Sequence, residues 1–132
     1  MREIKFRAWD KTRSEYLSAG KVMIEILPHR RPKQGTIYLD ILDYKYPNRF
    51  ILEQLTGLKD KNGVQIYEGD ILSKIVTTNY PPVKIVIEFN QGMFKQYRTE
   101  SNTTSSTPIG YVSPECLEVI GNIHENPELL DD

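Results

Sequence analysis

The sequence predicts a mainly β protein with little helix, and three observations lead to this prediction. Apolar and polar residues alternate in short runs along most of the chain, which is the period of a half-buried strand. Turn signals recur at roughly 8 to 12 residues beyond Phe50, a spacing typical of small barrels and sandwiches. Eight Tyr and four Phe supply rings that suit pleated surfaces. We therefore expect an N-terminal β segment packed on a C-terminal barrel or sandwich.

The N-terminal segment begins with a strand over residues 3–9, where Ile4, Phe6 and Ala8 share one face. Residues 10–14 carry polar turn chemistry before the chain returns. Later runs end at Pro28 and at a Pro-Asn turn signal after residue 46, because proline cannot donate to a sheet. The further strands expected here cover residues 16–17, 22–27 and 36–43.

Residues 50–58 fit two structures. Ile51, Leu55 and Leu58 would lie on one stripe of a helix, with Gly57 near its end. The run is nevertheless short, and periodicity alone does not distinguish a short apolar helix from a strand. We expect a strand.

Beyond residue 58 the sequence predicts a series of hairpins. Residues 60–63, Asp-Lys-Asn-Gly, predict a tight turn, since Asn and Gly accept the positive φ that hairpins require. Residues 83–89 form the clearest strand, with Val83, Ile85, Ile87 and Phe89 expected to face inward. Gly121 predicts a bulge or a close backbone approach. The other predicted segments are strands at 71–77, 93–97, 109–112 and 117–124, a turn at 90–92, a mobile loop at 99–108, and an acidic end at 125–132 that is at most partly ordered.

Composition and charge exclude several classes of protein. The 17 Lys and Arg are balanced by 18 Asp and Glu, whereas a protein that binds nucleic acid over its whole surface carries a basic excess. The single cysteine, Cys116, cannot form an intramolecular disulfide. No apolar run reaches the length of a membrane span, and the N-terminus lacks the apolar stretch of a signal peptide. We expect a soluble, cytoplasmic protein without a membrane partner.

Three stretches carry a resemblance to a known family. They are the opening MREIKFRAWD, the central TGLKDKNGVQIYEGDIL and the late VIGNIHENPELL. In this order and spacing they resemble the YopX family of phage and prophage proteins. The resemblance implies a phage or prophage origin, a bacterial host cell, and a C-terminal part similar to SH3-type barrels. It implies no activity and no catalytic residue. The expected organisation is a β subdomain over 1–50, an SH3-like β-barrel over 51–125 and an acidic tail over 126–132.

Two groups of residues could form a cation-binding or catalytic site. Asp60, Glu68 and Asp70 could bind a cation or polarise a substrate, or they could cap backbone N–H groups in the turns beside them. The capping interpretation explains every residue without a ligand. Cys116 and His124 could be a nucleophile and its base, although a lone cysteine is more often a buried apolar filler. We expect no enzyme activity, catalytic residue, metal or cofactor.

Two surfaces are candidates for binding a partner. Trp9 beside Arg7 would anchor an interface if exposed, because both residue types are favoured there, or Trp9 could be covered within the chain. A basic and aromatic region could instead contact phosphates and stack bases. The residues of this second candidate are His29, Arg30, Arg31, Lys33, Tyr44, Tyr46 and Arg49.

The sequence therefore favours a non-enzymatic accessory protein that binds another protein or its own copies, because exposed strand edges readily associate. The alternative is a regulatory protein that binds nucleic acid through the basic region at residues 29–49.

Overall fold

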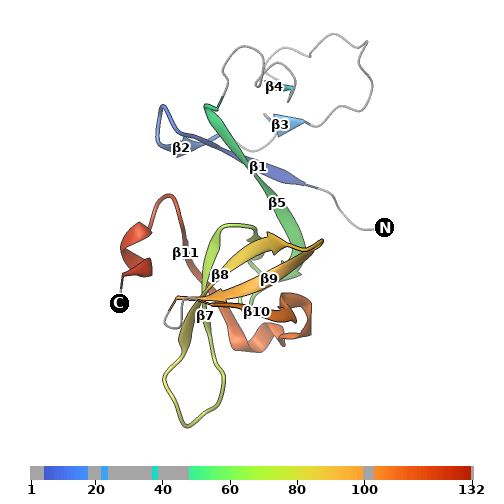
Figure 1. The fold of residues 1–132 in the computed structure, drawn as a ribbon, viewed down its shortest axis with the longest axis vertical. Helices are drawn as coiled ribbons and strands as arrows, with labels where there is room; N and C mark the ends of the chain where they lie inside the picture. Colours follow the sequence, from blue (N-terminus) through green and yellow to red (C-terminus); the bar gives the residue numbers. More distant parts are fainter. Residues whose placement is uncertain (1–4, 18–21, 24–36, 39–47, 100–102, 132) are drawn as a thin grey trace. The chain divides into compact units, whose positions relative to one another are not determined.

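The computed structural model describes residues 5–17, 22–23, 37–38, 48–99 and 103–131 (Figure 1). In these residues the protein is mainly β, with two antiparallel sheets and no α-helix, which confirms the predicted fold class. The chain divides into two compact units. One comprises Lys5–Gln54 and the other is built from Leu55 onward, so the division falls within one strand, β5 (Phe50–Lys59).

In the Lys5–Gln54 unit, a central strand pairs antiparallel on both sides. β1 (Phe6–Asp10) pairs with β2 (Glu15–Tyr16) and with the first half of β5. The ambiguous segment at residues 50–58 is therefore a strand, as expected, because its backbone completes the ladder with β1. The described residues also include a short parallel pair, β3 (Val22–Met23) with β4 (Ile37–Tyr38).

In the unit from Leu55 onward, a five-stranded antiparallel sheet, curled into half a barrel, has the order β10-β9-β8-β7-β11 among the described residues. The second half of β5 pairs with β6 beside it. The strand bounds are β6 (Gln65–Tyr67), β7 (Asp70–Lys74), β8 (Val83–Asn90), β9 (Met93–Arg98), β10 (Thr103–Pro108) and β11 (Leu117–Asn122). Short 3-10 helices follow at η1 (Ile109–Tyr111), η2 (Pro114–Cys116) and η3 (Pro127–Leu130).

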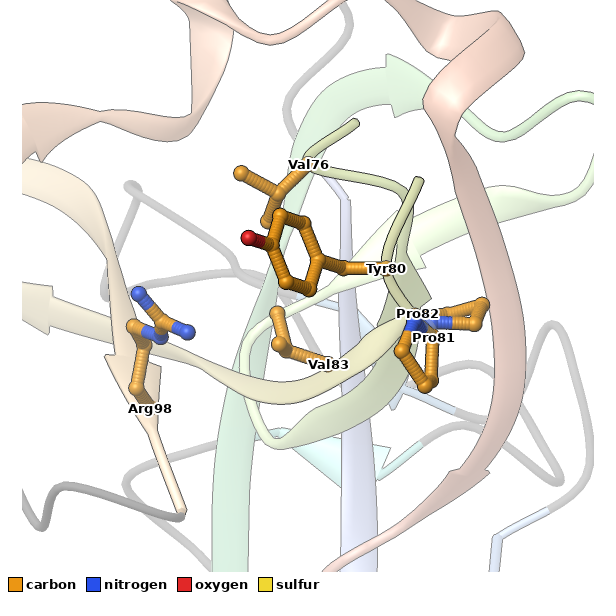
Figure 2. Close-up of a pocket in the computed structure, with 6 residues that line it drawn as sticks. All are labelled: Val76, Tyr80, Pro81, Pro82, Val83 and Arg98. Carbon is orange, nitrogen blue, oxygen red and sulfur yellow. The ribbon is translucent and has the colours of Figure 1, made fainter. Parts of the chain in front are cut away.

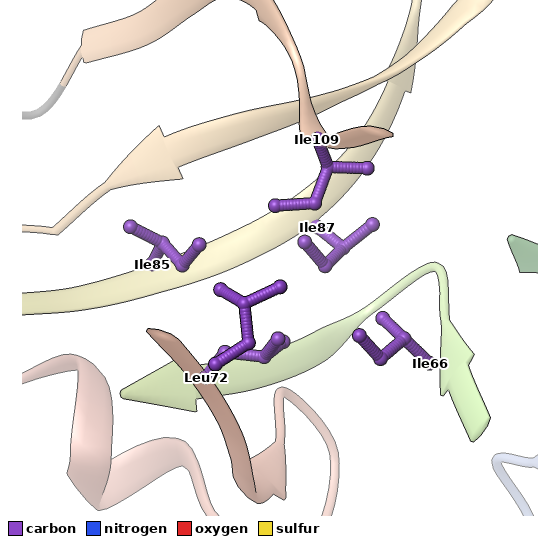
Figure 3. Close-up of a cluster of buried hydrophobic side chains, with 6 residues drawn as sticks. Ile66, Leu72, Ile85, Ile87 and Ile109 are labelled. Atoms are coloured by element: carbon purple, nitrogen blue, oxygen red, sulfur yellow. The ribbon is translucent and has the colours of Figure 1, made fainter. Parts of the chain in front are cut away.

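The hydrophobic core of this unit lies on one face of the curled sheet (Figure 3). Leu72 of β7 stands opposite Ile85 of β8, and Ile87 follows two residues later on the same face. All three side chains are at most 1% exposed. The cluster consists of Ile66, Leu72, Ile85, Ile87, Ile109 and Leu117.

Phe89 departs from the predicted inward face. Phe89 is 51% exposed and packs edge to face with Phe94 across the hairpin, with ring centroids 5.1 Å apart. The turn itself is as predicted, with Gln91 and Gly92 both at positive φ. Phe89 lies at the hairpin end of β8, where residues 90–92 are exposed as well, so alternation alone does not determine whether its side chain is covered.

Two C-terminal predictions were wrong. The segment predicted as a mobile loop at 99–108 contains β10, because its backbone pairs with β9 whatever its polarity. The strand predicted at 109–112 is instead the 3-10 turn η1. The acidic end contains η3, and Lys84 Nζ donates a 2.7 Å hydrogen bond to the carbonyl of Leu129 within it.

Gly121 marks a bulge, which is one of the two alternatives predicted for it. The register of β11 against β7 shifts between Val119 and Gly121, which is a β-bulge. A Cβ atom at position 121 would lie 2.6 Å from Oδ1 of Asn126, so the turn after β11 requires glycine here.

We expect Gly121→Ala to lower the free energy of unfolding by about 1–3 kcal/mol, because the new methyl group overlaps the Asn126 side chain. Chemical denaturation followed by circular dichroism measures this. Gly110→Ala is the matched control, since a Cβ there meets no atom within 4 Å. The cost of Gly121→Ala should shrink in an Asn126→Gly background; an equal cost in both backgrounds would contradict the steric explanation.

Candidate functional site

An open pocket of about 450 Å³ lies at one end of the curled sheet, in the unit from Leu55 onward (Figure 2). Its volume falls within the range of small ligand sites. The loop between β7 and β8 forms most of its wall, and β9 contributes a cationic side chain. We call it the β7–β8 pocket, and its lining residues are Val76, Tyr80, Pro81, Pro82, Val83 and Arg98.

Strand register places this pocket at the end of the core face. Val83 stands opposite Lys74, and Arg98 stands opposite the core residue Ile85. Directly opposed residues in an antiparallel pair share one face, and so do residues two apart on a strand. Val83, Lys74 and Arg98 therefore continue the core face, and the pocket begins where the buried isoleucines end.

The wall of the pocket exposes apolar surface to solvent. The side chain of Tyr80 is 73% exposed and that of Val76 is 53% exposed. Figure 2 shows the Tyr80 ring between Val76 and Val83, with its hydroxyl directed to the same side of the pocket as Arg98. The sequence did not single out Tyr80, Pro81 or Arg98 as a candidate site. A tyrosine directly before two prolines in a strand connection was the available signal.

Two cationic side chains, Lys74 and Arg98, lie on this face. Lys74 Nζ donates a 2.5 Å hydrogen bond across β8 to Oε1 of Gln96, which is 2% exposed. Burial lowers the pKa of the Lys74 ammonium group, and the positive charge of Arg98 lowers it further. The repulsion between Lys74 and Arg98 favours a negative charge nearby.

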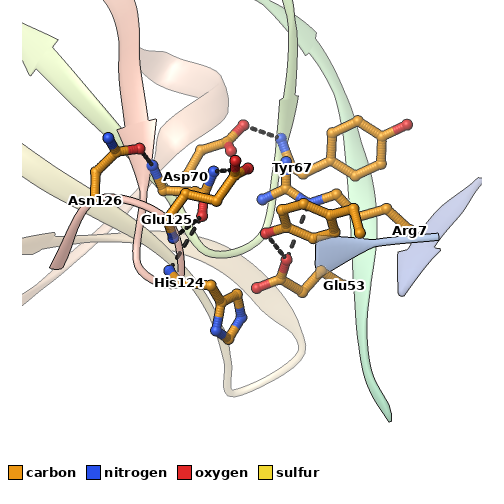
Figure 4. A network of polar contacts seen from close by, with 9 residues as sticks. Arg7, Glu53, Tyr67, Asp70, His124, Glu125 and Asn126 are labelled. Carbon is orange, nitrogen blue, oxygen red and sulfur yellow. Dashed lines mark hydrogen bonds and ion pairs between the residues drawn. The ribbon is translucent and has the colours of Figure 1, made fainter. Parts of the chain in front are cut away.

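Residues 56–72 contain two turns, one between β5 and β6 and one between β6 and β7. Oδ1 of Asp60 accepts hydrogen bonds from the N–H groups of Asn62 and Val64, both at 2.9 Å. Oδ2 of Asp70 accepts one from Tyr67 at 2.8 Å (Figure 4). Both carboxylates therefore cap backbone groups, as the structural interpretation predicted. Within the ranges that the structure describes, no three His, Cys, Asp or Glu side chains are grouped to hold a metal ion.

The late sequence motif folds into a turn after β11 (Figure 4). Oδ1 of Asn122 accepts hydrogen bonds from the N–H groups of His124 and Glu125, at 3.1 and 2.9 Å. Cys116 precedes β11 and His124 follows it. A six-residue strand at about 3.3 Å per residue separates the two by roughly 20 Å, so they do not form a nucleophile–base pair.

Arg7 and Trp9 make contacts within the Lys5–Gln54 unit. Nε of Arg7 donates a 2.9 Å hydrogen bond to Oε1 of Glu53, and its guanidinium lies 4.6 Å from the ring centroid of Tyr16. Trp9 is only 8% exposed and packs edge to face on the same tyrosine, at 4.9 Å. The structure thus gives Trp9 the intramolecular role that was the alternative to an exposed anchor.

Arg49 forms a bidentate ion pair. Its Nε and one terminal nitrogen each lie 2.9 Å from an oxygen of Asp10, which is 1% exposed. This ion pair links Arg49 to the buried carboxylate of Asp10 within the fold. The other members of the basic candidate region lie outside the described residues: His29, Arg30, Arg31, Lys33, Tyr44 and Tyr46.

Comparisons with known proteins bear on the whole chain. Among the described residues, no helix has the length and apolar character to cross a membrane. The comparison with curated proteins finds no match. The crystal structure of protein EF1440 from Enterococcus faecalis is similar over 99% of this chain and 100% of its own, with 27% identity and a TM-score of 0.64.

A second solved structure, YopX from Bacillus subtilis, covers the same shares of both chains with 20% identity and a TM-score of 0.62, which shows a common fold. The sequence model of the YopX protein family matches residues 5–131. This match spans nearly the whole length, both described units included. The chain therefore belongs to the YopX family.

Proposed function

We propose that this YopX-family protein is a non-enzymatic accessory protein of phage or prophage, which acts in the bacterial cytoplasm by binding another protein at the β7–β8 pocket. The observation that carries the proposal is the exposed Tyr80, which stands over apolar pocket walls beside Arg98. Tyrosine and arginine are the side chains most often found as anchors of protein interfaces.

The composition of the pocket supports binding more than chemistry. Five of its six lining residues are valine, proline or tyrosine, and the sixth is the arginine. Prolines hold the wall in a restricted backbone conformation and so reduce the entropy lost on association. The phage origin and the SH3-type barrel rest on the sequence motifs that resemble the family.

The test compares two exposed tyrosines of the same unit. We expect Tyr80→Ser to abolish retention of the partner protein in pull-downs from bacterial lysate, because it removes the apolar anchor from the pocket. Tyr111→Ser is the matched control, since Tyr111 is 82% exposed and lies outside the pocket. Both variants should melt within a few degrees of the parent protein, because an exposed side chain contributes little to stability.

A protein retained by the parent and by Tyr111→Ser but lost with Tyr80→Ser, and bound again as purified material, supports the proposal. Light scattering on the parent protein reports whether that partner is a second copy. Retention independent of Tyr80, or no retained protein at all, would overturn it. A gel shift at low salt with single-stranded DNA tests the nucleic-acid alternative, for which binding must weaken steeply as salt rises.

A further inference from the structure

We propose that the β7–β8 pocket recognises a short acidic peptide segment, with an apolar side chain against Tyr80 and a neighbouring carboxylate against Arg98. This inference rests on the proposed function and names the chemistry of the partner. It follows from the charge of the pocket face and from the position of that charge relative to the apolar wall.

Two cationic side chains lie on the pocket face of the sheet. Arg98 lines the pocket, Lys74 belongs to the same face, and none of the six lining residues carries a carboxylate. The ammonium of Lys74 is half-buried and close enough to Arg98 for the two charges to repel. A carboxylate bound beside Arg98 would offset that repulsion and form charge-assisted hydrogen bonds, which are stronger than neutral ones.

The apolar part of the site lies next to this charge. Val76 and Tyr80 expose more than half of their side-chain surface, and two prolines continue the wall. In Figure 2 the prolines lie on one side of the Tyr80 ring and Arg98 on the other. A ligand that fits must therefore present an apolar group and an anionic group a few ångströms apart, as a Leu-Glu or Pro-Asp sequence does.

A peptide fits this arrangement better than a nucleic acid. Single-stranded nucleic acid is bound by a positive groove that follows several phosphates and by several stacking rings. The pocket offers one ring and the cations of one sheet end, and the whole chain has a net charge of −1. The apolar valine and proline walls match aliphatic side chains.

Selection from a display library of random heptapeptides tests the inference on the full chain. We expect the peptides enriched on the parent protein to combine Asp or Glu with Leu, Ile, Pro or an aromatic residue. The selected peptides are then synthesised with each acidic residue replaced by its amide, so that charge changes while shape is kept. We expect the amide versions to bind at least about tenfold more weakly, the usual effect of losing a charged hydrogen bond.

Protein variants locate the interaction. Arg98→Gln should weaken binding of the acidic peptides by a similar factor and leave binding of their amide versions nearly unchanged. Lys61→Gln is the control, because Lys61 is an exposed cation that pairs with Glu118 outside the pocket. If Arg98→Gln does not fold, the comparison of acidic and amide peptides on the parent protein still decides the result.

The outcomes separate the two proposals. Enriched peptides that lose binding with Tyr80→Ser but show no preference for acidic residues would overturn the inference and leave the protein-binding function standing. No enrichment that depends on Tyr80 would overturn both. Tyr80-dependent binding of oligo-dT with no enriched peptide would identify the pocket as a nucleic-acid site and overturn both as well.

Discussion

Arg49→Met lowers the free energy of unfolding of the Lys5–Gln54 unit by about 3–5 kcal/mol, the usual cost of leaving one partner of a buried ion pair alone. Asp10 is 1% exposed, and both its oxygens lie 2.9 Å from nitrogens of Arg49. Without the guanidinium, a carboxylate remains buried beside the N–H groups of Thr12 and Arg13 alone. Trp9, the only tryptophan of the chain, reports unfolding of this unit by fluorescence.

Arg13→Met is the control for this prediction. Arg13 faces Glu15 at 3.9 Å with both side chains more than half exposed, so its removal should change stability by less than about 1 kcal/mol. The double variant Asp10→Asn with Arg49→Met should recover part of the loss, because no buried charge is left unpaired. Equal effects of Arg49→Met and Arg13→Met would show that the Asp10 pair contributes little.

The same pair predicts a pH dependence. The hydrogen bond from Arg49, against the opposing effect of burial, lowers the pKa of Asp10 from 3.8 to about 2. A carboxyl whose pKa is depressed by folding stabilises the protein above its unfolded pKa and loses that contribution as pH falls through the folded value. We therefore expect the difference between parent and Asp10→Asn to be full near neutral pH and to shrink from about pH 4 to about pH 2.

Asp60→Ala lowers the stability of the unit from Leu55 onward by about 3–5 kcal/mol, because three backbone donors lose a charged acceptor worth roughly 1.5–3 kcal/mol each, less what water recovers. Two donors belong to the turn itself, and the third is the N–H of Val119 in β11, 2.9 Å from Oδ2. Hydrogen exchange at the amides of Asn62, Val64 and Val119 measures the loss at each bond.

Asp60→Asn and Glu118→Ala complete this experiment. The amide can keep the two bonds made by Oδ1, so Asp60→Asn should cost less than Asp60→Ala. Glu118 is next to Val119 but is 43% exposed in its pair with Lys61, so Glu118→Ala should change stability by less than about 1 kcal/mol. If exchange becomes faster at Asn62 and Val64 but is unchanged at Val119, the carboxylate of Asp60 stabilises only the turn.

Burial alone would raise the pKa of Asp60, but the hydrogen bonds from Val119, Val64 and Asn62 outweigh it and leave the pKa below its ordinary value. The contribution of Asp60 is therefore present above the unfolded pKa and is lost as pH falls through the folded one.

The ion pair between Asp10 and Arg49 affects the interpretation of binding experiments. Arg49 was a candidate phosphate contact, yet its replacement is expected to destabilise the fold, so weaker binding by an Arg49 variant would not identify a contact. Tyr80 and Tyr111 avoid this difficulty because both are largely exposed.

Features of the fold that depend on neighbouring residues were predicted correctly from the sequence. Alternation predicted β1, β8 and β11, and Asp60 with Gly63 predicted a turn that the structure contains. Gly121 predicted a bulge or a close backbone approach, and the structure contains the bulge. Each of these features depends on residues within a few positions of one another or on the period of a strand.

The errors arose where distant segments decide the outcome. The segment 103–108 forms a strand because its backbone pairs with β9, and Phe89 is exposed because it lies at the hairpin end of β8. Trp9 and Arg49 were candidate partner contacts, with a position covered within the chain as the alternative for Trp9, and only the structure shows their contacts with Tyr16 and Asp10.

The sequence by itself determined the β class, the family motifs and the turn chemistry of residues 56–72, because propensity, alternation and capping are local. Only the tertiary structure decided the β7–β8 pocket. Its wall and its cation come from positions 76–83 and 98, which are adjacent only because β8 pairs with both β7 and β9. Register between strands is a long-range property, and it brings Tyr80 beside Arg98.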